Sequence, residues 1–444
     1  MPIGAFKLNT ISALLAGAGS DAPVIPTGLT FTRYDQPGIG YNPSVYPAPK
    51  GIAYVGVNNS RAHWATAGYS GTSQYQQMHN TTFSASPNIA YSTAGAGTTG
   101  MNMFALSSPG LNGTTGGQYM SIIGTPASIR TRSGIVTGWA SGTSTGATSG
   151  GTISVSQART SSYTTPTVTS AHSPYTVTPS THRFLMAYHT VVSTTNYIAI
   201  AAGTQNTGSA TATFGITLVS NTQIASSTTS AFGNWIDACG FTTASTTETR
   251  YAVGYTGSTT TYVVRATKIL SNAAYTTAVT AYTGSTILTA CVDTLWDDYA
   301  NNKSLAVSCI TISSGNTYLR SILITNWNGG TTTAPVVSLG TQVTIGSQLS
   351  NAKISKISGS GLGLLTYLNS TGNRYLARFI SVDSATGNIT VGNEFDLDGV
   401  NRTVSPAGFS ASCSLDANNK LQLGMYGYNA GSWVYTWYRS INAI

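Results

Sequence analysis

The chain has 444 residues and a formal net charge of +8; 41% of its residues are hydrophobic and only 7% are charged. An ordinary soluble domain carries about 25% charged residues, so polar contacts here depend on Ser, Thr, Gly and Asn, while the apolar content excludes a disordered chain. The 20 basic residues form no runs. This excludes a nucleic-acid footprint and leaves either scattered surface cations or a mild attraction to anionic cell-surface polymers.

In the first 15 residues, apolar positions are interrupted by Lys7, Asn9 and Ser12. This pattern lacks the basic start and continuous apolar stretch of a secretion signal. No stretch of the chain approaches the roughly 18 apolar residues of a membrane span, so membrane insertion is not expected. The apolar side chains instead predict a short amphipathic segment, which either packs on its own chain or docks on another protein.

Residues 28–34 have the pattern of a strand without a hairpin of their own. After them, a short apolar strand, a polar turn and a second strand rich in Tyr and Arg recur seven times. In the last four copies the second strand opens with Tyr262, Tyr318, Tyr375 and Trp433, at intervals of 56, 57 and 58 residues. Three weaker copies lie at 52–64, 119–130 and 184–200. Such a period is typical of propellers and arrays.

Flanking strands complete each clear copy: a strand of small residues precedes the hairpin, and an outer strand follows three of the four. Four antiparallel strands per copy form a propeller blade. We therefore predict an all-β fold, a seven-bladed β-propeller of four-stranded antiparallel blades. The last copy has no outer strand before Ile444, and residues 28–34 are expected to supply it and close the ring. The alternative fold is a pair of tandem β-sandwich domains with a break near Ser170.

The predicted organisation is an N-terminal anchoring segment, residues 1–20, followed by a propeller, residues 21–444. The expected blades are 35–95, 96–160, 161–225, 226–283, 284–347, 348–400 and 401–444 plus strand 28–34.

Cysteines occur at four positions without CxxC spacing or nearby His partners. Three of them fall in predicted inner strands, where Cys behaves as a small buried hydrophobe. We expect all four to be free thiols, as in a protein folded in a reducing cytoplasm. The positions are Cys239, Cys291, Cys309 and Cys413.

Carboxylates that suit catalysis are scarce. Asp293, Asp297 and Asp298 surround Trp296, and a carboxylate pair can perform acid–base chemistry on a sugar. Adjacent residues of a strand point in opposite directions, however, which argues against one shared site. Residues 396–399 resemble the start of a calcium loop but lack its closing Glu. The sequence predicts no catalytic residue, no metal site and no cofactor, and therefore no enzyme.

Aromatic residues beside predicted turns are the best candidates for ligand contacts. Aromatic rings with neighbouring amides suit sugars, because they combine stacking faces with directional hydrogen bonds. The alternative is that each ring packs between blades. The candidate glycan-binding residues are Tyr69, Tyr75, Trp296, Tyr299, Trp327, Tyr428 and Trp433.

The start of the chain, Ile3-Gly-Ala-Phe-Lys-Leu-Asn9, resembles the N-termini of virion structural proteins from marine and cyanobacterial phages. The Thr/Gly/Ser-rich, weakly charged body resembles β-rich phage appendage proteins, although it lacks collagen-like or coiled-coil shaft repeats, which favours a compact knob or decoration over a trimeric fibre. In such proteins the N-terminus commonly attaches to the particle and the distal body meets the host. The resemblance implies docking contacts at Phe6, Leu8, Ile11, Leu14 and Leu15.

The leading hypothesis is thus a non-enzymatic phage tail or capsid protein, located in the virion and assembled in the host cytoplasm. Its expected partners are other virion proteins and a host cell-surface polysaccharide, without nucleic acid, and copies of the chain can associate on the particle. The alternatives are a free carbohydrate-binding module and a glycan-processing enzyme, the latter with its carboxylates at the mouth of the central channel.

Overall fold

The structure, a computed structural model, describes the chain in separate ranges, and between residues 34 and 168 it describes the backbone alone. Within the described ranges every regular element is a β-strand. The ranges are 22–37, 52–57, 61–70, 73–82, 89–96, 103–107, 118–125, 128–135, 148–154, 168–173, 181–192, 195–206, 212–214, 222–227, 235–243, 248–270, 273–328, 333–357, 361–369, 374–397, 399, 410–416, 418–429 and 432–444.

The described strands form seven antiparallel sheets, numbered here in chain order with strands given from the inside outward. Sheet 1 contains β2 (Ile52–Val57), β3 (Arg61–Ser70), β4 (Ser73–Thr82) and β5 (Ile89–Ala96). Sheet 2 contains β6 (Met103–Ser107), β7 (Gln118–Thr125), β8 (Ser128–Ile135) and β9 (Thr148–Ser154). Sheet 3 contains β10 (Val168–Ser173), β11 (Thr181–Val192), β12 (Thr195–Asn206), and β13 (Ala212–Phe214) with β14 (Thr222–Ser227).

The remaining four sheets follow the same order. Sheet 4 contains β15 (Ile236–Phe241), β16 (Glu248–Ser258), β17 (Thr261–Leu270) and β18 (Ala273–Thr283). Sheet 5 contains β19 (Ile287–Asp298), β20 (Lys303–Ile312), β21 (Thr317–Thr325) and β22 (Val336–Ile345). Sheet 6 contains β23 (Ser350–Lys356), β24 (Leu362–Leu368), β25 (Tyr375–Val382), and β26 (Ile389–Val391) with β27 (Phe395–Asp396). Sheet 7 contains β28 (Ser410–Leu415), β29 (Lys420–Asn429), β30 (Ser432–Ala443) and β1 (Phe31–Pro37).

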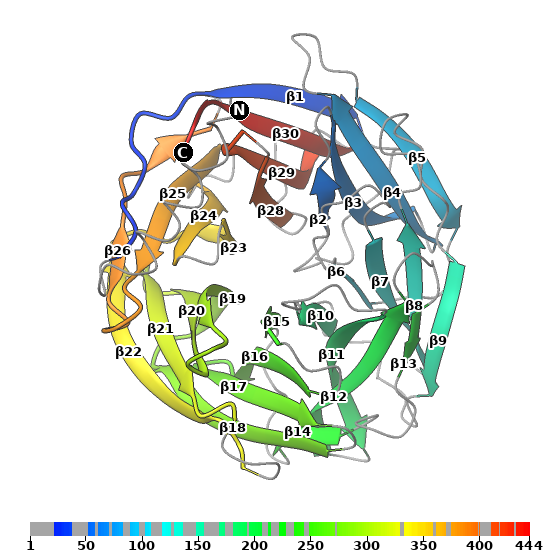
Figure 1. Ribbon diagram of the computed structural model, residues 1–444, viewed down its shortest axis with the longest axis vertical. Coiled ribbons are helices and arrows are strands. Elements are labelled where there is room, and N and C mark those ends of the chain that lie inside the picture. Colours follow the sequence, from blue (N-terminus) through cyan, green and yellow to red (C-terminus); the bar gives the residue numbers. More distant parts are fainter. Residues whose placement is uncertain are drawn as a thin grey trace, which may run out of the picture.

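The sheets surround a central axis (Figure 1). Each innermost strand contacts the innermost strand of the next sheet, and β28 of sheet 7 contacts β2 of sheet 1, so the ring closes. Closure uses both ends of the chain, because β1 pairs with β30 from Phe31 opposite Ser440 to Pro37 opposite Val434. The fold is a β-propeller closed by an N-terminal strand, as predicted. The tandem sandwich is wrong, since Ser170 lies inside a blade strand rather than at a break.

The antiparallel order gives the ring two distinct faces. Every innermost strand begins at the same face, which we call face A, and ends at the opposite one, face B. Turns between second and third strands, and connections between sheets, therefore lie at face A. Turns between first and second strands, and between third and fourth strands, lie at face B.

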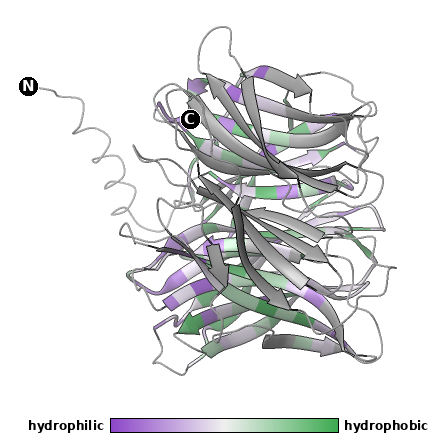
Figure 2. Ribbon diagram, turned by 90° about the vertical axis from the view of Figure 1, so that its right-hand side faces the viewer, coloured by the Kyte–Doolittle hydropathy of each residue, from purple (hydrophilic) through white to green (hydrophobic). Residues whose placement is uncertain are grey.

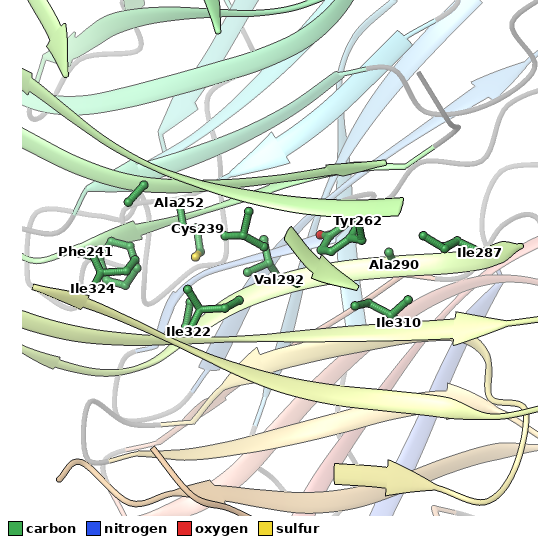
Figure 3. Packing of buried hydrophobic residues seen from close by; sticks show 14 of the residues in the cluster. Cys239, Phe241, Ala252, Tyr262, Ile287, Ala290, Val292, Ile310, Ile322 and Ile324 are labelled. Carbon is green, nitrogen blue, oxygen red and sulfur yellow. The ribbon is translucent and has the colours of Figure 1, made fainter. Parts of the chain in front are cut away.

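In sheets 3 to 7, where the structure describes side chains, alternating side chains fill the junctions between neighbouring sheets. Between sheets 4 and 5 the buried cluster includes Phe241, Tyr262, Val292 and Ile322 (Figure 3). Further clusters join sheets 3 and 4, sheets 5 and 6, and sheets 6 and 7. In the side view, hydrophobic and hydrophilic residues are interspersed along the coloured strands (Figure 2). All four cysteines are buried free thiols, as expected.

Residues 22–31 form a strap that crosses sheet 6 before β1 joins sheet 7. Pro23 and Ile25 of the strap lie against two glycines of sheet 6. A Cβ atom added to Gly361 would lie 3.4 Å from Pro23 Cδ, and one added to Gly392 would lie 2.9 Å from Ile25 Cγ2, so neither position has room to spare. The ring of Phe31 stacks on that of Phe395 with centroids 5.9 Å apart. Because β1 runs antiparallel to β30, the strap reaches the ring at its face B end.

Candidate functional site

The candidate glycan-binding residues are divided between the two faces. Tyr69 and Tyr75 flank the β3–β4 turn, and Tyr428 and Trp433 are register partners beside the β29–β30 turn, so these four lie at face A. Their side chains are outside the described residues. Sheets 7 and 1 are neighbours in the ring, so the topology gathers these four positions. The other three candidates lie at face B, and one common site is therefore ruled out.

Trp327 corrects the sequence prediction. Its side chain is 0% exposed and belongs to the cluster between sheets 4 and 5. The indole N–H donates to Ser304 Oγ at 2.9 Å, so the polar edge is satisfied inside the protein. Trp327 offers no face to a sugar. Trp296 is partly buried against the next junction, with Lys303 Nζ 5.7 Å from its ring centroid.

Tyr299 begins the turn that joins β19 to β20. The turn ends at Asn302, whose φ of 55° lies in the left-handed region that Asn tolerates. The backbone N–H of Asn302 donates to the Tyr299 carbonyl at 3.2 Å. The Tyr299 ring is partly buried and lies 4.6 Å from the guanidinium carbon of Arg250, which covers one of its faces.

Arg250 occupies the centre of this face B cluster and was not anticipated from the sequence. Its side chain is 0% exposed. Nε donates to Glu248 Oε1 at 2.5 Å, and Nη2 donates to Asn302 Oδ1 at 3.1 Å and to Asn328 Oδ1 at 2.8 Å. Both asparagines belong to sheet 5, whereas Arg250 and Glu248 belong to sheet 4. The cluster therefore joins two sheets, which is a structural role.

Lys268 contributes a second buried cation to the same cluster. Its ammonium group donates to the Trp327 carbonyl at 2.9 Å. Burial lowers the pKa of Lys268, and the nearby carboxylate of Glu248 opposes that shift. The cluster thus holds two buried cations, Arg250 and Lys268, and Glu248 is the carboxylate that pairs with Arg250.

The three carboxylates considered for catalysis each have structural hydrogen bonds. Asp293 accepts from the backbone N–H of Thr294 at 2.8 Å and from that of Lys356 in sheet 6 at 3.1 Å. Asp297 accepts from the backbone of sheet 4 and from Ser304 Oγ at 2.6 Å. Asp298 accepts from Asn301 within its own turn. The structure therefore does not bring the three together around one point.

Asp237 forms the same kind of link one copy earlier, 56 residues before Asp293. It is 5% exposed and accepts from the N–H of the next residue, Ala238, at 2.9 Å. That oxygen, Oδ1, also accepts from the Thr169 hydroxyl of sheet 3 at 3.3 Å, and Oδ2 accepts from the Val292 N–H of sheet 5 at 3.1 Å. The repeat thus places an aspartate where innermost strands meet, and one carboxylate ties three sheets.

Replacing Asp237 with Ala is expected to lower the free energy of unfolding by about 3 kcal/mol, because two buried backbone N–H groups lose their acceptor. Urea denaturation followed by circular dichroism measures the change. Asp298→Ala is the control: it removes a carboxylate from a solvent-facing turn and is expected to cost about 0.5 kcal/mol. Equal losses for the two variants would contradict the role of Asp237 as a link.

Asp396, the first residue of the calcium-loop-like sequence, bonds within the chain. Asp396 Oδ1 accepts from the N–H of Gly399 at 2.8 Å, and its Oδ2 pairs with Arg374 Nη1 at 3.0 Å. No group of three or more metal-ligating side chains occurs among the residues that the structure describes. Within the same ranges, no helix has the length and apolar character needed to span a bilayer.

The topology defines the class of protein: a β-propeller. Among solved structures the chain is similar to AofleA from Arthrobotrys oligospora, with 8% identity, a TM-score of 0.45, and coverage of 93% of this chain and 88% of that one. It is similar to the Trypanosoma rangeli sialidase at 8% identity and a TM-score of 0.41, covering 94% of this chain and 59% of that one. It is also similar to the WD40 domain of SCAP from fission yeast, with 9% identity, a TM-score of 0.36, and coverage of 93% of this chain and 98% of that one. No family model and no curated protein matches the sequence.

Proposed function

We propose that the chain is a non-enzymatic virion appendage protein of a bacteriophage, docked on the particle by residues 1–20 and presenting its propeller to a host-surface glycan. The observation that carries this proposal is the strap. Residues 22–31 are fixed across sheet 6 and reach the ring from face B. The proposed docking residues Phe6, Leu8, Ile11, Leu14 and Leu15 lie outside the described residues, but the chain that follows them is held at face B.

This attachment gives the two faces different roles. A particle that holds the N-terminal segment lies toward face B, and face A then points away from it. The four aromatic positions of sheets 7 and 1 lie at face A, which suits contact with a host glycan. The hydrogen bonds of Asp293, Asp297 and Asp298 support binding rather than turnover, because each carboxylate already holds backbone or side-chain donors.

Deleting residues 1–20 tests the docking part of the proposal. In cells that produce the phage, the full chain is expected to sediment with purified particles, whereas the shortened chain stays in the soluble fraction with the same melting temperature. Immunoblotting of gradient fractions measures the distribution. Phe6→Asp/Leu8→Asp is a second variant with unchanged length and the same expected loss. A shortened chain that still sediments with particles overturns the docking role, and a full chain absent from particles overturns the virion proposal.

A further inference from the structure

Three arginines occupy corresponding positions in three consecutive sheets. Arg265, Arg320 and Arg378 lie in the third strands β17, β21 and β25, at intervals of 55 and 58 residues. All three side chains are partly exposed. Arg320 and Arg378 are each the fourth residue of their strand and Arg265 is the fifth of its strand. Since third strands run from face A to face B, these positions lie in the half of the sheets nearer face A.

Strand alternation turns these arginines toward the preceding sheet. Arg320 lies on the same face of its strand as Tyr318 and Ile322, which pack in the cluster between sheets 4 and 5. The chain neighbours of Arg265, Val264 and Ala266, pack toward sheet 5, so Arg265 lies on the opposite face of the strand and faces sheet 3. Arg378 contacts Tyr367, which packs in the cluster between sheets 5 and 6.

In sheet 6 the chain itself supplies an anion to this arginine. Arg378 Nε donates to the Tyr367 hydroxyl at 3.0 Å, and Nη2 donates to Glu394 Oε2 at 3.3 Å. The hydroxyl in turn donates to the same carboxylate oxygen at 2.5 Å. Burial and the hydrogen bond to Glu394 raise the pKa of Tyr367, so its hydroxyl stays protonated. The edge formed by Nε and Nη2 therefore faces a carboxylate and a hydroxyl.

In sheets 4 and 5 the Nε atoms of the corresponding arginines, Arg265 and Arg320, lack a hydrogen-bond acceptor. Nη1 is used in both, since Arg265 donates to Thr276 Oγ1 at 3.0 Å and Arg320 donates to Gln342 Oε1 at 3.2 Å. The Nε of each is buried without a hydrogen-bond partner. A guanidinium has five donors, and an unmet one is unfavourable. An anion that bridges Nε and Nη2 would satisfy it as Tyr367 and Glu394 do in sheet 6.

We propose that Arg265 and Arg320 bind carboxylates of an acidic, uronate-bearing polysaccharide. This inference rests on the proposed function and names the class of glycan. The guanidinium and carboxylate form a charge-assisted pair, and binding requires each guanidinium to turn outward, because its Nε is enclosed. The net charge of +8 favours a polyanion. Two such sites in neighbouring sheets allow one polymer to engage both, which raises its overall affinity.

The experiment measures binding of the full chain to immobilised polygalacturonate, dextran sulfate and neutral dextran by surface plasmon resonance. The Arg265→Gln/Arg320→Gln variant is expected to bind polygalacturonate at least about tenfold more weakly. Arg374→Gln is the matched control, because it removes one cation that is already paired with Asp396, and it is expected to keep wild-type affinity. Thermal unfolding confirms that each variant is folded.

Glu394→Gln adds a test by gain of function. It removes the chain's own carboxylate from Arg378, and affinity for polygalacturonate is expected to rise severalfold. An unchanged or lower affinity contradicts the argument from sheet 6. If the double variant binds dextran sulfate more weakly but binds polygalacturonate as the wild type does, the preference for carboxylates is overturned. If the wild type and the double variant bind neutral dextran as strongly as they bind polygalacturonate, the inference is overturned but glycan attachment is not. Absence of binding to all three polymers also overturns the inference, while particle docking is decided separately by deletion of residues 1–20.

Discussion

A chain that lacks residues 1–37 is expected to lose its folded monomeric state. The deletion removes β1 and the strap together, so β30 is left as an unpaired edge and sheet 6 loses the Phe31 ring that stacks on Phe395. An exposed edge strand pairs readily with another chain. Size-exclusion chromatography is expected to show aggregates, and circular dichroism to show no cooperative melting transition.

The control is the chain that lacks only residues 1–20, which keeps every described contact of the strap and is expected to melt like the full chain. A synthetic peptide of residues 22–37, added during refolding of the chain lacking residues 1–37, is expected to recover monomer. If the shorter chain is a monomer with an unchanged melting temperature, closure by β1 is not needed for stability.

Replacing Arg250 with Met is expected to lower the free energy of unfolding by about 4 kcal/mol, since breaking a buried ion pair leaves its partner unpaired. Glu248 would lose the guanidinium that donates to it, and the side-chain oxygens of Asn302 and Asn328 would lose their donor. The apolar replacement preserves most of the volume, so the loss measures polar contacts more than a cavity. Chemical denaturation with guanidinium chloride measures the change.

Two further variants define the origin of this loss. Arg250→Met combined with Glu248→Gln is expected to be more stable than Arg250→Met alone, because the side chain that loses the Arg250 guanidinium is then uncharged, while Lys268 keeps its hydrogen bond to the Trp327 carbonyl. Arg374→Met removes an ion pair whose arginine side chain is 43% exposed and is expected to cost at most about 1 kcal/mol. A loss that is the same for Arg250→Met and Arg374→Met would contradict the structural importance of burial at Arg250.

The repeat was the part of the fold that the sequence could reveal. The aromatic residues that open the second hairpin strand in the last four copies fall in β17, β21, β25 and β30. Strand alternation and turn residues are local, so they survive in a single sequence. The closing strand was predicted at residues 28–34 but spans Phe31–Pro37, because its limits are set by pairing with β30 rather than by its own composition.

Tertiary partners decide the features that the sequence did not reveal. The outer strand of sheet 6 is divided in the structure into two short strands, β26 and β27, although the sequence predicts one outer strand per copy. Between them, Arg378 Nη1 donates to the Gly392 carbonyl, and Glu394 turns toward the same guanidinium. Trp327 was misjudged for a related reason: its burial depends on a neighbouring sheet.

Some of the missed features left a trace in the sequence. Asp237 and Asp293 occupy corresponding positions in two copies, as do the three arginines of sheets 4 to 6. Aligning the copies residue by residue would have marked both sets, although not their roles. Local composition alone could not distinguish a carboxylate that links sheets from one that faces a ligand.

The strand that closes the ring is made long before its partner. Thr32 and the residue it contacts on β30, Arg439, are 407 residues apart. At a ribosomal rate of about 5–20 residues per second, β1 waits roughly 20–80 s for that partner to be synthesised. During this time sheets 1 to 6 can assemble into an open arc, whose two terminal sheets each expose a face. Ring closure is therefore a late step, and the speed of translation limits when this protein can become resistant to proteases and to pairing with other chains.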